Sequence, residues 1–306
     1  MEPQQIVKSG NVDLAVYAWG SHGEKPTIVM VHGYPDSARV WTACAEMLKA
    51  RYHVIAYDVR GAGRSSRPRR IADYALDHLV SDLGAVIDAV SPQRPVHLVC
   101  HDWGSIQCWE AVTTAALQNR IASYTSISGP SLDHAGHWVA QRLKSGTPKK
   151  IAQVARQFAR SWYVFMFQLP MLAPAAWKLG LGKRWPAILH KTEGFRPPPS
   201  ATQTQDGCDG VKLYRANFFS RVFAPHQRHT GLPVQLIVPA RDPFMVPEIW
   251  DDLAQWVPRL WRRDIDAGHW LPLSHPQQVA AWAAEFAEFV DSGVESAALK
   301  RARRSA

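Results

Sequence analysis

The sequence has few cysteines, no long uninterrupted apolar run and no apolar segment at its start. Its 306 residues include four cysteines, and no two of them are spaced as C-x-x-C, so neither a zinc site nor a redox motif is expected. The longest apolar stretch, residues 162–177, is interrupted by a glutamine and two prolines, and about 18 uninterrupted apolar residues are needed to cross a bilayer. The first ten residues lack the apolar core of a secretory signal. These absences favour a reducing, cytoplasmic location.

The chain also lacks an acidic excess, because Lys and Arg number 35, Asp and Glu number 26, and the net charge is +9. The cations are scattered apart from residues 67–70 and 300–304, and no stacking motif or recognition helix accompanies them. We therefore expect no nucleic-acid partner. Most of this charge is interpreted as solvated, with weak attraction to an anionic membrane surface as the alternative.

Signals for metals and cofactors are also weak. Two H-x-x-H pairs, at residues 134–137 and 226–229, have no third carboxylate or cysteine placed with them, so no metal is expected. The Gly61-Ala62-Gly63 segment lacks the further glycine and the helix of a dinucleotide-binding loop. The sequence thus predicts neither a metal nor a nucleotide cofactor.

Short apolar runs alternate with helical patterns in much of the chain. Thr27–Val31, TIVMV, is a continuous apolar run, which is typical of a strand that is covered on both faces. Strands are expected at residues 12–19, 27–31, 52–57, 95–100, 123–128, 234–238 and 261–265, and helices at 40–48, 74–90, 105–117, 248–256 and 277–290. This alternation predicts an α/β fold with a mostly parallel, twisted sheet and helices on both faces.

The strand pattern stops between residues 131 and 230, where the chain is helical, aromatic and punctuated by prolines. We expect one α/β core, residues 1–130 and 231–292, with a helical cap at 131–230 inserted into it. Residues 293–306 are expected to be a loose, polar and basic tail. Several of the 13 tryptophans lie between residues 138 and 185; they indicate an aromatic cavity, although scattered core and surface positions would explain them equally well.

A carboxylate stands where a strand turns sharply into a helix, in Cys100-His101-Asp102-Trp103-Gly104. This segment fits the pattern small-x-nucleophile-x-small of a strained strand-to-helix turn, with Asp102 as the nucleophile. An aspartate is already ionised at neutral pH and needs no base before it attacks carbon. Asp102 would form an ester, and the hydrolysis of that ester would require a base and water.

A base and an orienting acid follow at the ends of two later strands. His269 lies in Asp-Ala-Gly-His-Trp after the last strand, and Asp242 lies in Val-Pro-Ala-Arg-Asp after the strand before it. The order nucleophile, acid, histidine is that of α/β hydrolases. A strand-end aspartate alone is more often a cap or turn former, but the three together predict a catalytic triad. The backbone N–H groups of Trp103 and Tyr34 are expected to form an oxyanion hole.

These motifs resemble those of the α/β-hydrolase superfamily, and within it those of the epoxide hydrolases. The segments VHGYPDS, YDVRGAGRSSRP, HDWG, ARDPFMVP and GHWLPLSHP stand in the family's order over nearly the whole chain. The resemblance implies the α/β-hydrolase fold, a cis peptide before Pro35 and no cofactor. It also implies two cap tyrosines that hydrogen-bond the epoxide oxygen. Tyr163, in SWYVFMFQLP, and Tyr214, in LYRAN, match them.

The predicted reaction is hydrolysis of a lipophilic epoxide to a vicinal diol through an Asp102 ester. The alternative is a haloalkane dehalogenase with the same triad, in which the Trp103 indole would hold the halide; Tyr34 and the two cap tyrosines argue against it. A third possibility is a binding protein that has kept the fold without turnover.

A narrower resemblance comes from HDWGSIQCWEAVT, SISGPSLDHAGHW and SWYVFMFQLP. These segments are similar to the hydrolase half of mycobacterial proteins that fuse an epoxide hydrolase to a short-chain dehydrogenase. The resemblance implies lipid epoxides as substrates and peripheral membrane contact. It leaves open a following dehydrogenase domain, and a homodimer is open as well.

Overall fold

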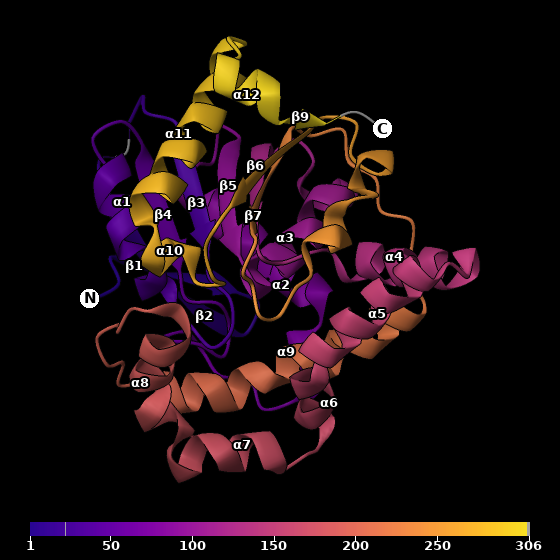
Figure 1. Cartoon of the computed structure of the whole chain (residues 1–306). Coiled ribbons are helices and arrows are strands. Elements are labelled where there is room, and N and C mark those ends of the chain that lie inside the picture. Colours follow the sequence, from indigo (N-terminus) through magenta and orange to yellow (C-terminus); the bar gives the residue numbers. More distant parts are fainter. Residues whose placement is uncertain (22, 305–306) are drawn as a thin grey trace.

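The computed structural model describes residues 1–21 and 23–304, which form a nine-stranded sheet with helices on both faces (Figure 1). The strand order is β1-β2-β4-β3-β5-β6-β7-β8-β9. Neighbouring strands from β4 to β8 are parallel, and the pairs β1–β2, β2–β4 and β8–β9 are antiparallel. The strands are β1 Gln5–Ser9, β2 Val12–Trp19, β3 Thr27–Val31, β4 His53–Tyr57, β5 Val96–His101, β6 Ile121–Ile127, β7 Val234–Pro239, β8 Leu260–Ile265 and β9 Arg303–Arg304. The predicted, mostly parallel α/β sheet is confirmed.

The two faces of the sheet have separate apolar clusters. Successive side chains of a strand point to opposite faces, and in β3 Ile28 and Met30 join one cluster whereas Val29 and Val31 join the other. One face is covered by α1 and α11, and the other by α2 and α3. The core helices are α1 Thr42–Leu48, α2 Leu76–Val90, α3 Trp103–Thr113, α10 Leu271–Ser274, α11 Pro276–Ser292 and α12 Ala297–Ala302.

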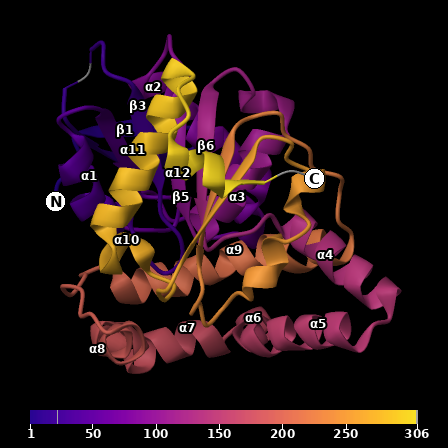
Figure 2. The same ribbon diagram turned by 45° about the horizontal axis from the view of Figure 1, so that its top comes forward.

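Between β6 and β7 the chain forms helices and no strand, in a stretch that the structure describes in full. We call residues 131–230 the cap. Figure 2 shows α5, α6, α7 and α8 as a row farthest from the sheet, with α9 between this row and the core. The cap helices are α4 Leu132–Ser145, α5 Pro148–Arg160, α6 Trp162–Gln168, α7 Leu172–Ala176, the π-helical turn η4 Trp177–Leu181, α8 Gly182–Glu193 and α9 Gln203–Phe223.

The prediction that the tail is loose is wrong for the part that the structure describes. Residues 297–304 form α12 and β9, and β9 pairs with β8 to form the last strand of the sheet. Leu299 and Ala302 are buried in a cluster with Trp261 and Phe286, so two apolar side chains anchor a largely basic segment. Residues 305–306 lie outside the described residues.

Two further local predictions differ from the structure. The helix expected at residues 248–256 is two short 3-10 helices, η5 Pro247–Trp250 and η6 Leu253–Gln255. The edge strand β1 was not predicted. Its sequence, QIVKS, shows no alternation of apolar and polar residues, and only one of its five side chains is buried.

Candidate active site

Asp102 occupies the tight turn between β5 and α3. Its φ of 51° and ψ of −123° place a non-glycine residue in a strained backbone region, which persists only where the surroundings enforce it. The turn packs closely against the sheet, because a Cβ on Gly104 would lie 2.2 Å from the carbonyl oxygen of Val31. The turn carries the Asp102 side chain out of the sheet and into a cavity beneath the cap.

The loop after β3 supplies a hydrogen-bond donor to this carboxylate. The backbone N–H of Tyr34 donates to Asp102 Oδ1 at 2.7 Å, and the backbone N–H of Trp103 also interacts with the carboxylate. Gly33 permits this approach, because a Cβ there would lie 2.3 Å from Oδ1. The Tyr34–Pro35 peptide is cis, as the family resemblance implied. Two backbone donors therefore converge on one side of Asp102.

His269 lies between two carboxylates. Its Nδ1 is 2.9 Å from Asp242 Oδ2, and its Nε2 is 3.6 Å from Asp102 Oδ2. The other oxygen of Asp242 accepts the backbone N–H groups of Phe244 at 2.8 Å and Met245 at 3.2 Å, which fixes the carboxylate. The three residues that the strand ends predicted therefore meet in one buried cluster.

The electrostatics of this cluster favour an ion pair in the resting protein. Burial alone would lower the pKa of His269, but the attraction of Asp242 and the hydrogen bonds to Asp102 and Asp242 raise it to about 10. Burial alone would raise the pKa of Asp102, but the hydrogen bond from His269 and the nearby charges hold it below its usual value. At neutral pH an ionised Asp102 thus faces a protonated His269.

His101 supports the histidine loop. Its Nε2 is 3.0 Å from the backbone carbonyl oxygen of His269, and burial with the nearby charge of His269 lowers the pKa of His101 to about 4. A neutral imidazole whose Nε2–H donates to that carbonyl positions His269 and does not act as a base.

The two cap tyrosines share cavities with Asp102. Tyr163 lies on α6 and Tyr214 on α9, with ring centroids 6.0 Å apart, and both line the two cavities that Asp102 also lines. Burial raises the pKa of each phenol above its ordinary value, and the negative charge of Asp102 adds to this effect. Both phenols are therefore protonated at neutral pH and can donate hydrogen bonds.

The larger cavity has a volume of about 630 Å³, within the range of small-molecule sites. Three of the cap tryptophans, Trp162, Trp177 and Trp185, line it together with Trp270, so the aromatic cavity indicated by the sequence exists. Trp138 lies elsewhere and donates to the Glu248 carbonyl. A second, narrower cavity of about 50 Å³ shares Asp102 and both tyrosines with the first and is otherwise lined mainly by residues of α3, α4, α5 and α9.

Tyr34 also joins α9 to the core. Its hydroxyl donates to the Gly207 carbonyl at 3.0 Å and accepts the indole N–H of Trp177 at 2.7 Å. A Cβ on Gly210 would lie 2.4 Å from the Tyr34 ring, so glycine is needed for α9 to approach this closely. Sequence reasoning assigned only the backbone of Tyr34 and missed the role of its side chain.

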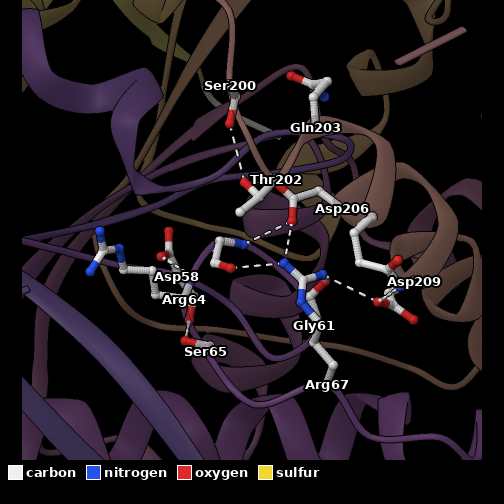
Figure 3. Close-up of polar contacts among 12 residues, drawn as sticks. Asp58, Gly61, Arg64, Ser65, Arg67, Ser200, Thr202, Gln203, Asp206 and Asp209 are labelled. Atoms are coloured by element: carbon white, nitrogen blue, oxygen red, sulfur yellow. Dashed lines mark hydrogen bonds and ion pairs between the residues drawn. The ribbon is translucent and has the colours of Figure 1, made fainter. Parts of the chain in front are cut away.

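A charged network fixes the start of α9, and sequence reasoning missed it. Figure 3 shows Arg67 between Asp206 and Asp209 of α9, and its guanidinium donates to them at 2.7 and 3.2 Å. Arg67 also donates to the backbone carbonyls of Gly61 and Gly63, both at 2.8 Å. An arginine that bridges two carboxylates of one helix through charge-assisted hydrogen bonds holds α9 in register over the core, and the same helix carries Tyr214 two turns later.

The residues after Tyr214 serve the same purpose. Arg215 donates to the carbonyls of Phe167 and Leu169 at 2.6 and 2.7 Å, at the end of α6. The buried Asn217 bonds the core segment at residues 74–76 at 2.9 and 3.0 Å. The segment from Tyr214 to Asn217 therefore links the helix of Tyr163 to the core.

Glu193, the last residue of α8, touches the histidine loop. Its Oε1 accepts the backbone N–H of His269 at 3.3 Å, and its Oε2 is buried with no hydrogen-bond partner among the described residues. Gly268 makes room for this contact, because a Cβ there would lie 2.1 Å from Oε2. Glu193 is the only acidic residue between 134 and 205, which is the one signal in the sequence that singles it out.

The H-x-x-H histidines have structural surroundings. His134, His137 and His229 surround Trp256, with ring centroids 4.8 to 5.5 Å from it. Among the described residues, no three His, Cys, Asp or Glu side chains are grouped so that they could hold a metal ion.

Comparison with known proteins identifies the family of the chain. A family model described as the alpha/beta hydrolase fold matches residues 26–276. "Probable oxidoreductase EphD" of Mycobacterium tuberculosis is 40% identical over 302 residues, covering 95% of this chain and 50% of that protein. Epoxide hydrolase A of the same species is 32% identical over 196 residues, covering 64% of this chain and 56% of that protein. The chain spans about half the length of these curated relatives.

Solved structures show the same fold. A mutant of an epoxide hydrolase from Bacillus megaterium, bound to its diol product, has a TM-score of 0.78 at 22% identity, covering 93% of this chain and all of that chain. An epoxide hydrolase from Vigna radiata has a TM-score of 0.71 at 22% identity, covering 93% of this chain and 97% of that chain. The resemblance to epoxide hydrolases is confirmed by these relatives, and the chain belongs to the alpha/beta hydrolase fold family.

Proposed function

We propose that the protein hydrolyses an epoxide to a vicinal diol through an ester on Asp102. The observation that carries the proposal is the cavity in which the Asp102 carboxylate and two protonated phenols lie together. Asp102 Oδ2 attacks an epoxide carbon, the carbon–oxygen bond opens, and the alkoxide takes a proton from Tyr163 or Tyr214. Two donors aimed at the developing charge suit this step.

His269 then acts as the general base in hydrolysis of the ester. Water attacks the ester carbonyl carbon, His269 takes a proton from that water, and the backbone N–H groups of Tyr34 and Trp103 stabilise the oxyanion. Collapse releases the diol and regenerates the Asp102 carboxylate. The oxygen that already accepts the Tyr34 N–H is the one that becomes the oxyanion, so this donor is in place before the reaction begins.

Ester formation itself prepares His269 as a base. The Asp102 carboxylate lies 3.6 Å from Nε2, and at an effective dielectric constant of about 20 a unit charge pair at that distance is worth roughly 5 kcal/mol. Esterification removes this negative charge, so the pKa of His269 falls from about 10 towards neutrality, where a general base works best. The proton that His269 then releases equals in number the proton that the phenolate from the first step needs to become a phenol again.

The cavities support a lipophilic substrate. Asp102 and the two tyrosines line both the aromatic cavity of about 630 Å³ and the narrower apolar one of about 50 Å³. An epoxide bound at Asp102 would therefore extend apolar substituents in two directions. This arrangement favours an epoxide within a chain over one on a small polar molecule.

A single-turnover experiment in ¹⁸O-labelled water with excess enzyme tests the ester. The first-turnover diol should carry unlabelled oxygen from Asp102, whereas direct addition of water would label it at once. A panel from styrene oxide to long-chain fatty-acid epoxides should yield diol with the wild type and none with Asp102→Ala. A fully active Asp102→Ala variant would rule out the proposed chemistry.

Haloalkane dehalogenation is the second candidate, and one observation favours it. The buried indole N–H of Trp103 faces the Tyr214 hydroxyl, so a donor for a halide is available beside Asp102. The Tyr34 hydroxyl is already engaged by Gly207 and Trp177, so it does not complete a halide site. Halide release from bromoalkanes, faster than diol formation from every epoxide tested, would reverse this order.

A further inference from the structure

The outer row of cap helices exposes large apolar side chains on neighbouring segments. Met171 is 81% exposed, Leu179 is 87% exposed and Trp162 is 64% exposed. We define the cap patch as Trp162, Phe165, Met166, Leu169, Met171, Leu172 and Leu179, which lie on α6, α7, η4 and the turn between α6 and α7. Apolar side chains that are gathered and exposed in this way mark an interaction surface.

The same part of the chain is strongly cationic. Residues 134–205 contain eleven Lys and Arg, and their single acidic residue, Glu193, is turned inwards onto the His269 backbone. Eight of these cations are exposed and form no ion pair with any described residue. They are Lys144, Lys149, Lys150, Lys178, Lys183, Arg184, Lys191 and Arg196.

We propose that the cap patch, together with the exposed cations of residues 134–205, docks on the surface of an anionic phospholipid bilayer. Apolar side chains inserted at the headgroup boundary and cations that attract anionic lipids act together in interfacial binding. Lysine and arginine stems cover apolar surface while their charged ends reach the headgroups. The absence of outward-facing acid from residues 134–205 fits this partner, because each exposed carboxylate would be repelled by the lipid.

The alternative partners fit less well. In a symmetric dimer through the cap patch, two sets of like charges would face each other, which costs several kcal/mol. A nucleic acid would leave Met171, Leu172 and Leu179 without apolar contacts. Within the described residues no single helix could span a bilayer; only α6 together with Leu172–Glu193 passes by length and composition, and that pair is bent by 101°. The docking proposed here is therefore at the surface.

This docking would connect the bilayer to the site. Trp162 belongs to the cap patch and also lines the larger cavity, and Phe165 belongs to the patch and also lines the narrower one. A lipophilic substrate could therefore pass from the bilayer to Asp102 along apolar side chains without crossing water. This part of the inference rests on the proposed function, whereas the docking itself does not.

Co-sedimentation with lipid vesicles tests the docking. The purified chain is mixed with vesicles of phosphatidylcholine alone or with about 30 mol% phosphatidylglycerol. We expect binding to the anionic vesicles that weakens as salt rises from about 0.05 to 0.5 M, and little binding to the neutral ones. Absence of binding to anionic vesicles at low salt would overturn the proposal.

A double variant and a control variant test the apolar part of this surface. Met171→Asp with Leu179→Asp should weaken partitioning at least roughly tenfold, because about 1.5–3 kcal/mol of apolar burial is lost at each site. Val294→Asp is the control, since that side chain is 74% exposed outside the cap, and it should bind as the wild type does. Equal binding by the double variant and the wild type would refute the assignment.

A pair of charge-reversal variants tests the contribution of the cations to vesicle binding. Lys183→Glu with Arg184→Glu should weaken partitioning by roughly tenfold or more, at about 1 kcal/mol for each cation near the surface. Lys300→Glu with Arg301→Glu, on α12 at the far end of the molecule (Figure 1), changes net charge equally and should have little effect. Equal losses in both pairs would show attraction by net charge alone and would overturn a localised surface.

Two further measurements, the stability and activity of the variants and the oligomeric state of the protein, distinguish membrane docking from misfolding and from self-association. All of these variants should keep the wild-type melting temperature and wild-type hydrolysis of styrene oxide without vesicles, because none of the changed side chains lines a cavity with Asp102. If sedimentation velocity shows a dimer that the Met171→Asp/Leu179→Asp variant dissociates, and vesicles bind nothing, the patch is a self-interface and the proposal fails. Vesicle binding by a protein that hydrolyses no epoxide would support the docking and refute the proposed function.

Discussion

Replacing Asp242 by asparagine would isolate the charge of the orienting acid, because the substitution keeps the size of the side chain. Asp242 Oδ2 lies 2.9 Å from Nδ1 of His269, and at an effective dielectric constant of about 20 a unit charge pair at that distance is worth roughly 6 kcal/mol. About 1.4 kcal/mol corresponds to one pH unit of pKa. The pKa of His269, about 10 in the wild type, should therefore fall by about 4 in Asp242→Asn. Titration of isotopically labelled histidine by NMR measures it directly.

The same change should divide the reaction into its two steps. Asp102 remains ionised and can still attack the epoxide, but His269 loses the partner that holds its Nδ1–H and stabilises the imidazolium. Loss of the orienting acid of such a triad costs about 10³–10⁴-fold in turnover. The ester should therefore accumulate, and intact-mass spectrometry of Asp242→Asn mixed with an epoxide should find protein increased by the mass of one substrate.

Stability provides an independent check with a definite sign. Because the pKa of His269 is raised from 6.5 to about 10 in the fold, its contribution to stability is complete below pH 6.5 and is lost as the pH rises through about 10. The deficit of Asp242→Asn in the free energy of unfolding should therefore shrink as the pH rises across that window. Asp266→Asn is the control, because Asp266 is an exposed carboxylate three residues from His269. In this variant His269 should have the same pKa as in the wild type. An unchanged His269 pKa, or equal loss of ester formation and ester hydrolysis, would refute the reasoning.

Other substitutions test the cap and its attachment. Tyr163→Phe and Tyr214→Phe should each slow ester formation. The double variant should lose about 10²–10³-fold in this rate, a larger loss than either single variant shows because one donor can partly replace the other. Stopped-flow measurement of the rate at which Asp102 is alkylated tests this, and an unchanged rate in one variant would show that its tyrosine does not take part. Gly210→Ala places a Cβ 2.4 Å from the Tyr34 ring and should cost about 1–3 kcal/mol of stability with lower kcat, which denaturation and turnover check. Arg67→Met leaves the buried Asp206 without its cation and should cost about 3–5 kcal/mol; wild-type stability would show that the network contributes nothing.

The central strands were predictable because they are covered on both faces. Thr27–Val31 is entirely buried, as its continuous apolar run predicted, and such runs occur only where helices cover both sides of a parallel sheet. The edges of the sheet carry no such signal. β1 is held by backbone pairing with β2, and β9 is two arginines that are paired to β8.

Part of the site was predictable for a related reason. Parallel strands end at one edge of the sheet, so polar residues that follow those strands must lie near one another. Asp102, Asp242 and His269 each follow a strand and meet within hydrogen-bonding range or close to it. Tyr163 and Tyr214 come from helices of the inserted segment, and no periodicity in the sequence places a side chain of the cap over the core. Only the family resemblance singled them out.

The residues that sequence reasoning missed share one physical property, which is that they act across the boundary between cap and core. Arg67 lies in a core loop and bonds α9, and Glu193 lies in the cap and bonds the histidine loop. Each contact joins residues more than 70 positions apart and depends on how an inserted group of helices settles on the sheet. The cations that sequence reasoning interpreted as scattered are in fact unevenly distributed, because residues 134–205 contain eleven of them and a single acid, which is far from the balance of the whole chain. A segment that places its only carboxylate inside and most of its cations outside separates a catalytic interior from an interfacial exterior, and this separation links the proposed chemistry to the proposed docking.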